Sequence, residues 1–307
     1  MIINVLIGLG SMTEKIVKKI GLVGKGSLSV VIPKKWADSI GVRPGDEIGL
    51  IFDGSKITIV PHTQEEPENI NILIEIEEPD LALRKLIASY VEGVTRVKVR
   101  AEYTELLKIS EKLRESISMF MLRADPNSRI HEIIFDDVKT DITSTLKLIE
   151  SITTEILESL VNRDYEKATM YHREFMRIYR HFLRSLNLNL AENSVEPYEA
   201  IDLLLSIEYV KELVNTFINA RELTSSEVKC VEKLIELTEG SINALLVQDI
   251  DTAVNTASNV LKLLKNVDVE SDFCERCSYL ISKISELVLG RCIRNKACRC
   301  KHFYPKV

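Results

Sequence analysis

Long hydrophobic runs are missing from this sequence of 307 residues. The longest lies near the N-terminus, IINVLIGLG, and falls well short of the roughly 20 apolar residues that a membrane-spanning helix requires. The neighbouring charges, Glu14 and Lys15, follow this run, which is the reverse of the order in a secretory signal peptide. We therefore expect a cytoplasmic protein without a membrane span.

Aromatic residues and glycine are also scarce. Aromatic residues make up 6% of the chain, and there are only 12 glycines. A large β-sandwich is excluded by this composition, whereas 45% hydrophobic and 28% charged residues are ordinary for a soluble globular protein. The length allows two or more domains, each with its own core. We expect a multidomain, mainly α-helical protein.

Catalytic signatures are absent as well. The sequence contains no GxSxG, HExxH or GxxxxGKS motif and no Cys/His nucleophile signature. Its carboxylates are spread along predicted helix faces, where charge is usually solvated, and form no pair in contrasting environments of the kind that acid–base catalysis needs. We expect a protein that is not an enzyme.

The charged residues are divided unevenly along the chain. Residues 1–62 carry a net charge of +3, whereas the remainder carries −9. No acidic residue interrupts the stretch from residue 18 to residue 35, which contains five lysines: Lys18, Lys19, Lys25, Lys34 and Lys35. Such a basic module can contact a polyanion, because each neutralised phosphate releases counterions. The alternative is that the lysines form only the solvated surface of a dimerisation module.

The stretch around these lysines has a dense local pattern. In residues 27–32, Leu28, Val30 and Ile32 alternate with Ser29 and Val31, and β-branched side chains are frequent. This pattern predicts a strand. Pro33 suits the first position of a short helix, and Gly41 is its expected C-cap. After the turn RPGDE, the segments 47–52 and 56–60 are separated by DGS and predict a β-hairpin.

A unit of this size buries too little surface to be stable alone, so its strands are expected to find partners. The segments GKGSLSVVIPKKW (24–36), GVRPGDEIGL (41–50) and DGSKITIV (53–60) resemble the AbrB/SpoVT family of swapped-hairpin DNA-binding domains. In that family, two chains interleave their strands into one small barrel. The resemblance implies a homodimer with a core of Leu28, Val30, Ile32 and Trp36. It also implies that DNA is contacted by Lys18, Lys19, Lys25, Lys34 and Lys35.

A polar, proline-bearing segment, HTQEEPEN (62–69), predicts a linker to an α/β connector. The expected elements of the connector are a strand at 70–76, a helix at 80–93, a strand at 95–101, a helix at 104–123 and a strand at 129–136. No glycine-rich phosphate-binding loop occurs between them. We interpret the connector as a spacer.

An internal repeat follows the connector. ESLVNRDYEKA (158–168) aligns with NALLVQDIDTA (243–253) at an offset of 85, so that Asp164 matches Asp249. Each aspartate can cap the next helix by accepting hydrogen bonds from its first amides. The periodicity predicts two three-helix bundles, with helices at 137–161, 165–187, 196–221, 225–247, 250–266 and 271–290.

This half of the chain resembles PhoU, a regulator of phosphate uptake built from two similar three-helix bundles. The similarity covers approximately residues 80–290, and it is closest at NRDYEKA (162–168), EFMRIYRHFLRSL (174–186) and EIIFDDV (132–138). An AbrB-like domain fused to a PhoU-like body is an arrangement of archaeal relatives. The resemblance implies a phosphate-transporter ATPase subunit or a signalling kinase as the partner.

The metal-binding motifs of PhoU proteins are not retained. Members of that family carry ExxxD pairs, whose carboxylates lie one helical turn apart and bind a multinuclear metal cluster. The corresponding segments here are HREFM (172–176) and NTASN (255–259), and neither holds the carboxylate pair. We therefore expect that this chain lacks the metal cluster of the family.

Five of the six cysteines fall in the last 34 residues. A zinc site could form if the basic tail, residues 291–307, folded back along the preceding helix. Its ligands would be Cys274, Cys277, Cys298 and Cys300. Disulfide bonds are an alternative, as is the absence of either, and a small buried side chain is the simplest interpretation of Cys230 and Cys292.

Together these patterns predict five segments. They are an AbrB/SpoVT-like domain (1–62), an α/β connector (63–136), two PhoU-like bundles (137–222 and 223–290) and a Cys-rich basic tail (291–307). The leading functional hypothesis is a DNA-binding transcriptional regulator whose helical bundles relay phosphate status. The alternative is a protein-interaction regulator of phosphate transport or signalling, in which the N-terminal domain only dimerises.

Overall fold

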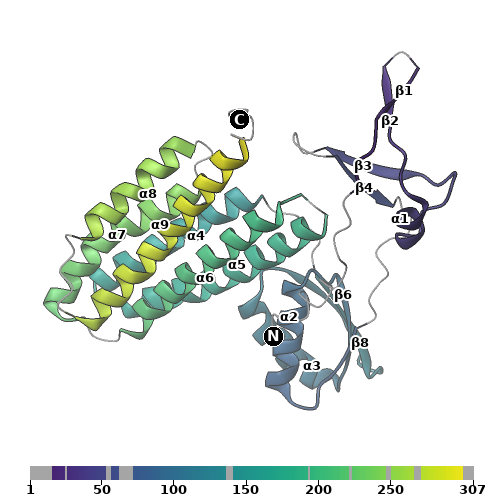
Figure 1. Ribbon diagram of the computed structural model, residues 1–307. Helices are drawn as coiled ribbons and strands as arrows, with labels where there is room; N and C mark the ends of the chain where they lie inside the picture. Colours follow the sequence, from purple (N-terminus) through teal and green to yellow (C-terminus); the bar gives the residue numbers. More distant parts are fainter. Residues whose placement is uncertain are drawn as a thin grey trace, which may run out of the picture. The chain divides into compact units, whose positions relative to one another are not determined.

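The chain divides into two compact units, residues 1–68 and residues 69–307 (Figure 1). The computed structural model describes residues 16–24, 26–52, 57–61, 72–135, 141–192, 194–220, 223–246, 250–265 and 271–299. Most of this part of the chain is helical, as expected from the sequence. None of the helices that it contains is long and apolar enough to cross a membrane.

Unit 1 contains two short hairpins and one short helix. Its elements are β1 (Gly21–Val23), β2 (Ser27–Ser29), α1 (Lys34–Ser39), β3 (Ile48–Phe52) and β4 (Ile57–Pro61). β1 pairs antiparallel with β2, and β3 pairs antiparallel with β4. Of the strand predicted at 27–32, Ser27–Ser29 is the part that pairs among the described residues, because β1 begins at Gly21, opposite Ser29. The swapped barrel stays a prediction.

Unit 2 begins with a four-stranded sheet covered on one face by two helices. The elements are β5 (Ile72–Glu75), α2 (Pro79–Val91), β6 (Arg96–Arg100), α3 (Tyr103–Ser116), β7 (Phe120–Arg123) and β8 (Ile130–Phe135). The strand order is β5-β6-β8-β7, with β5 parallel to β6 and the other neighbours antiparallel. Alternate strand residues, including Val97, Val99 and Ile133, are buried against α2 and α3, which lie on one side of the sheet (Figure 1).

The helix predicted at 104–123 is wrong at its C-terminal end, because residues 120–123 form strand β7. Phe120 and Leu122 are half-buried beside the core, whereas Met121 and Arg123 are exposed. This alternation of every second residue is the period of a strand. The turn that returns the chain to β8 is closed by Asp125, which accepts a hydrogen bond from the amide of Asn127 at 2.9 Å. An Asx turn of this kind favours a hairpin.

Six helices make up the rest of unit 2. They are α4 (Ile142–Val161), α5 (Tyr165–Ala191), α6 (Pro197–Asn219), α7 (Ser225–Leu246), α8 (Ile250–Leu264) and α9 (Asp272–Arg299). The predicted cap at Asp164 is confirmed, since its carboxylate accepts a hydrogen bond from the amide of Lys167 at 3.0 Å. α4 begins later than predicted because Asp141 caps it, accepting from the amides of Thr143 and Ser144.

Residues of all six helices contribute to one hydrophobic core cluster, and the division into two three-helix bundles stays a prediction. α4 packs against both α5 and α7, and α6 packs against α9, so helices from the two halves of the repeat lie side by side. Polar contacts also join α4 to α7: Thr154 donates to Glu239 at 3.0 Å, and Asn243 donates to Glu150 at 2.5 Å. Helices from the two copies of the repeat therefore pack together in one helical body.

The separate tail predicted to begin at residue 291 is wrong, because α9 continues to Arg299. Arg291 donates to the carbonyl of Leu245 at 3.1 Å and to the carboxylate of Glu199. Arg294 holds both oxygens of Asp202, at 2.6 and 3.2 Å. These contacts with α6 and α7 fix a stretch of helix whose basic composition alone suggested an extended tail.

Candidate nucleic-acid interface

The predicted DNA-binding lysines lie on the surface of unit 1. Lys34 and Lys35 are the first two residues of α1, while Lys18 and Lys19 precede β1, and all four are exposed. Lys25 lies outside the described residues. The structure therefore gives the four described lysines two locations, one at the start of the helix and one before the first strand.

Helix α1 is held by the two residues that the sequence marked as its ends. The carbonyl of Pro33 accepts hydrogen bonds from the amides of Trp36 and Ala37, at 2.9 and 3.2 Å. At the other end, Gly41 has a φ of 73°, and the amides of Gly41 and Val42 donate to Asp38 and Ala37, respectively. This is a Schellman C-cap, in which glycine takes the left-handed conformation without strain. The caps fix Lys34 and Lys35 on a short, defined helix.

The turn between α1 and β3 is also closed locally. The amide of Arg43 donates to the carboxylate of Asp46 at 2.7 Å, and the amide of Asp46 donates to the carbonyl of Arg43 at 3.1 Å. Gly45 between them has a φ of 97°, which a residue with a side chain rarely adopts. RPGDE therefore forms the compact turn expected from the sequence, and one of the few acids of unit 1 is engaged in it.

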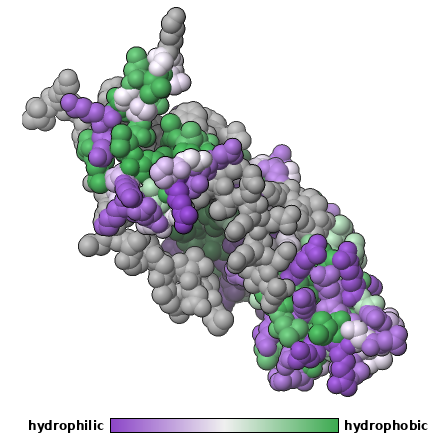
Figure 2. Space-filling view, turned by 90° about the vertical axis from the view of Figure 1, so that its right-hand side faces the viewer, coloured by the Kyte–Doolittle hydropathy of each residue, from purple (hydrophilic) through white to green (hydrophobic). Residues whose placement is uncertain are grey.

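No described residue of unit 1 whose exposure is given is buried. Leu28 is 69% exposed and Val30 is 53% exposed, Ile32 is exposed as well, and Trp36 is half-buried. Figure 2 shows hydrophobic surface gathered over the upper part of the view, where unit 1 lies. So much exposed apolar surface on a small unit is typical of a surface that another molecule covers.

The predicted four-cysteine zinc site is not brought together. Cys298 lies on the same helix as Cys274 and 24 residues further along, which places the two about 36 Å apart at 1.5 Å per residue. Cys274 forms a disulfide bond with Cys230 on α7, with 6.4 Å between their Cα atoms. The fold-back that the zinc alternative requires does not occur in the described residues, because they continue α9 to Arg299. Cys300 lies outside the described residues.

The remaining thiols near this position are poor metal ligands. Burial raises the pKa of the Cys277 thiol to about 12, so this side chain stays protonated near neutral pH. Cys292 is also buried. Within the described ranges, no three His, Cys, Asp or Glu side chains are grouped so as to hold a metal ion. His172, the first residue of HREFM (172–176), is hydrogen-bonded to Asn215 at 3.2 Å.

Sequence reasoning missed a row of polar side chains on α5 that joins the helices to the connector. Arg180 donates to the carbonyl of Ser116 at 2.7 Å, and Arg177 donates to that of Ser118 at 3.4 Å. Arg184 and Asn187 reach carbonyls at the end of α2. These four residues are spaced by three, four and three positions, which puts them on one face of α5. The arginines lie at the C-terminal ends of other helices, where a positive charge interacts favourably with the helix dipole. The same spacing is visible in the sequence RIYRHFLRSLN (177–187) and could have predicted a polar contact face on this helix.

Comparison with known proteins bears on unit 1 alone. The family model described as "Antidote-toxin recognition MazE, bacterial antitoxin" matches residues 22–67. No curated protein and no solved structure gives a significant match to the chain. The family match supports the swapped-hairpin type of domain expected at the N-terminus. Domains of this type typically form dimers and bind DNA.

Proposed function

We propose that this protein is a DNA-binding regulator that acts as a homodimer through unit 1. The observation that carries the proposal is the combination of four exposed lysines with exposed Leu28, Val30 and Ile32 in one small unit. Pairing two copies would bury the apolar side chains and double the number of lysines beside one another. The family match over residues 22–67 supports the same interpretation.

Binding through lysines is expected to be electrostatic and strongly dependent on salt. Each phosphate that a lysine neutralises contributes about −0.9 to the slope of log K against log salt concentration. Lysine contacts to phosphates position a protein on the duplex and read little sequence. Specificity would therefore come from other side chains of the paired units or from the shape of the DNA.

The helical body is proposed to relay phosphate status without catalysing a reaction. The resemblance of residues 162–168 and 174–186 to PhoU proteins supports this role and suggests a transporter ATPase subunit or a signalling kinase as partner. The α5 contacts with α2 and α3 support it as well, because they join the body to the connector. A rearrangement of the helices would then reach the sheet that precedes them.

A second candidate is an antitoxin-like role, which the description of the matching family model favours. In that case the exposed apolar residues of unit 1 would also contact a toxin. A third interpretation, in which unit 1 only dimerises, predicts no DNA binding. The same binding experiment separates this last interpretation from the first.

The test is fluorescence anisotropy of a labelled promoter fragment titrated with full-length protein across a salt series. Replacing Lys34→Ala/Lys35→Ala removes up to four phosphate contacts per dimer, so the slope should shrink by up to about 3.6. The matched control, Lys229→Ala/Lys233→Ala, removes two exposed lysines from α7 and should leave the slope unchanged. No binding at low salt by protein shown to be dimeric would refute DNA binding and leave dimerisation alone.

A further inference from the structure

The outer surface of α6 and α9 carries an unusual share of the exposed apolar side chains of unit 2. Among the described residues of α4 to α9, eight large hydrophobic side chains are exposed, and five of them belong to these two helices. We call this surface the α6–α9 face and define it by Tyr198, Ile201, Leu205, Tyr279 and Ile293. Their exposed fractions lie between 42% and 69%.

The α6–α9 face is continuous across the two helices, which pack against each other. The guanidinium of Arg294, next to Ile293 on α9, lies 5.6 Å from the ring centre of Tyr198 on α6. The ammonium of Lys283 lies 5.3 Å from the ring centre of Tyr279. The pKa of Lys283 is raised by Glu286 and by the nearby Tyr279 and Tyr209, and Tyr209 belongs to α6. Aromatic and aliphatic side chains thus line both helices.

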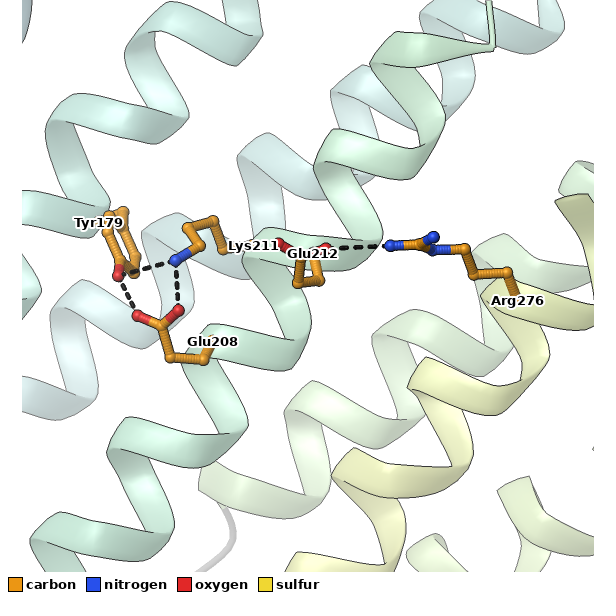
Figure 3. A network of polar contacts seen from close by, with 5 residues as sticks. All are labelled: Tyr179, Glu208, Lys211, Glu212 and Arg276. Carbon is orange, nitrogen blue, oxygen red and sulfur yellow. Dashed lines mark hydrogen bonds and ion pairs between the residues drawn. The ribbon is translucent and has the colours of Figure 1, made fainter.

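Basic side chains on this surface are paired with carboxylates of the same chain. Figure 3 shows Lys211 with Glu208, and Arg276 with Glu212 at 3.2 Å. The other pairs are Lys283 with Glu286, Arg291 with Glu199, and Arg294 with Asp202. The surface is close to neutral, although residues 141–290 contain ten more acidic than basic residues. Neutral apolar surface on an acidic body favours burial against a like surface over contact with a polyanion.

We propose that the α6–α9 face packs against the same face of a second copy of this chain around a two-fold axis. A two-fold axis brings the apolar side chains of one copy against those of the other, and the ion pairs within each chain leave little net charge on the face to oppose this contact. Two copies of an acidic body repel each other elsewhere, so this face is where they can meet. The inference rests on the proposed function in one respect: pairing through unit 1 would hold the second body at an effective concentration of roughly millimolar.

The first test places a photo-crosslinking residue on the face in the full-length protein. Tyr198→p-benzoylphenylalanine should give an interchain product that mass spectrometry maps to α6 or α9. The matched control is the same replacement at Met170, an exposed residue of α5, which should give no such product. A protein that is dimeric by light scattering but gives no interchain product, or products on other elements, would overturn the inference and leave pairing through unit 1 intact.

The second test weakens the face without touching the core. Ile201→Glu/Leu205→Glu changes two exposed side chains, so the fold should be retained, while four new charges meet across the two-fold axis. The dissociation constant of the full-length dimer should rise by about 100-fold or more, because one of two linked interfaces is lost. An unchanged dissociation constant would overturn the inference. The control Leu148→Glu/Met170→Glu should have no effect, whereas Leu28→Glu tests pairing through unit 1 separately.

Discussion

The guanidinium of Arg184 lies 4.9 Å from the ring centre of Tyr90, and Arg184 also donates a hydrogen bond to the carbonyl oxygen of Tyr90 at 2.6 Å. Arg184 is only 1% exposed, and it reaches a second carbonyl, that of Val94, at 3.0 Å. One side chain of α5 therefore satisfies two carbonyls at the end of α2. This relationship explains why the connector and the helices form one compact unit.

Replacing Arg184→Met should destabilise the protein strongly. Methionine fills part of the volume but removes the donor to the carbonyls of Tyr90 and Val94, of which that of Tyr90 still accepts from the amide of Gly93. Each hydrogen bond to a charged group contributes about 1.5–3 kcal/mol. We expect a loss of about 3 kcal/mol in the free energy of unfolding, measured by denaturant titration of the full chain. Arg129→Met, which removes an arginine whose side chain is 80% exposed, should change stability by less than about 0.5 kcal/mol. Equal stability of the two variants would contradict the role of Arg184.

The pair of Arg294 and Asp202 gives a second prediction, about the end of α9. The side chain of Asp202 is 7% exposed, so Arg294→Met leaves a buried carboxylate without its bidentate partner, which should cost about 3 kcal/mol of stability. The double replacement Arg294→Met/Asp202→Leu should recover most of this loss, because no buried charge remains. A double-mutant cycle by denaturant titration measures the coupling. Additive single effects would show that the end of α9 is not held by this pair.

The sequence was most informative where structure depends on neighbours in the chain. Helix α1 (Lys34–Ser39) lies between the two predicted end residues, with Pro33 as its N-cap, one position before the predicted one, and Gly41 after its last turn, because caps involve residues within a few positions. Helices α4 to α9 appear near their predicted positions, since a 3.6-residue period is local. Residues 120–123 were assigned to a helix because a short apolar run fits either period, and only pairing with β8 decides it.

Contacts between distant parts of the chain could not be predicted. The end of α9 was interpreted as a tail because its carboxylate partners on α6 lie 92 residues away. The partner of Cys274 is Cys230, 44 residues before it, and spacing alone does not select that pair. For the lysines of unit 1, composition identified the candidates, and the structure places Lys18, Lys19, Lys34 and Lys35 on its surface.

The bond between Cys230 and Cys274 gives a third prediction, concerning reducing agents. It closes a loop with a sequence separation of 44 residues, and loss of such a link removes about 4 kcal/mol of stability in the chain-entropy model. Denaturant titration of the oxidised protein should therefore show a lower midpoint after a reductant is added. In Cys274→Ala this dependence should vanish, while in Cys277→Ala, which removes a buried thiol outside the bond, it should persist. A reductant effect that survives in Cys274→Ala would contradict the assignment.

Glu150 gives the last prediction, which concerns pH. Burial raises the pKa of its carboxyl, and the nearby charge of Glu239 raises it further, while the hydrogen bond from Asn243 opposes both. A carboxyl whose pKa is higher in the folded state holds its proton more tightly there, so its contribution to stability falls as pH rises through the unfolded-state pKa, near 4.3, toward the raised value.

Glu150→Gln should therefore stabilise the protein at pH 7, because the amide keeps an acceptor for Asn243 and removes the repulsion with Glu239. The gain should be less than about 1 kcal/mol, since the side chain is only half-buried and solvent screens its charge. Denaturant titrations from pH 3.5 to pH 7 should show the difference from wild type shrinking to nothing at the acid end, where the carboxyl of Glu150 is protonated. The control Glu158→Gln removes a charge near the end of the same helix and should give no matching pH dependence. A constant difference at every pH would show that Glu150 acts through packing and not through its charge.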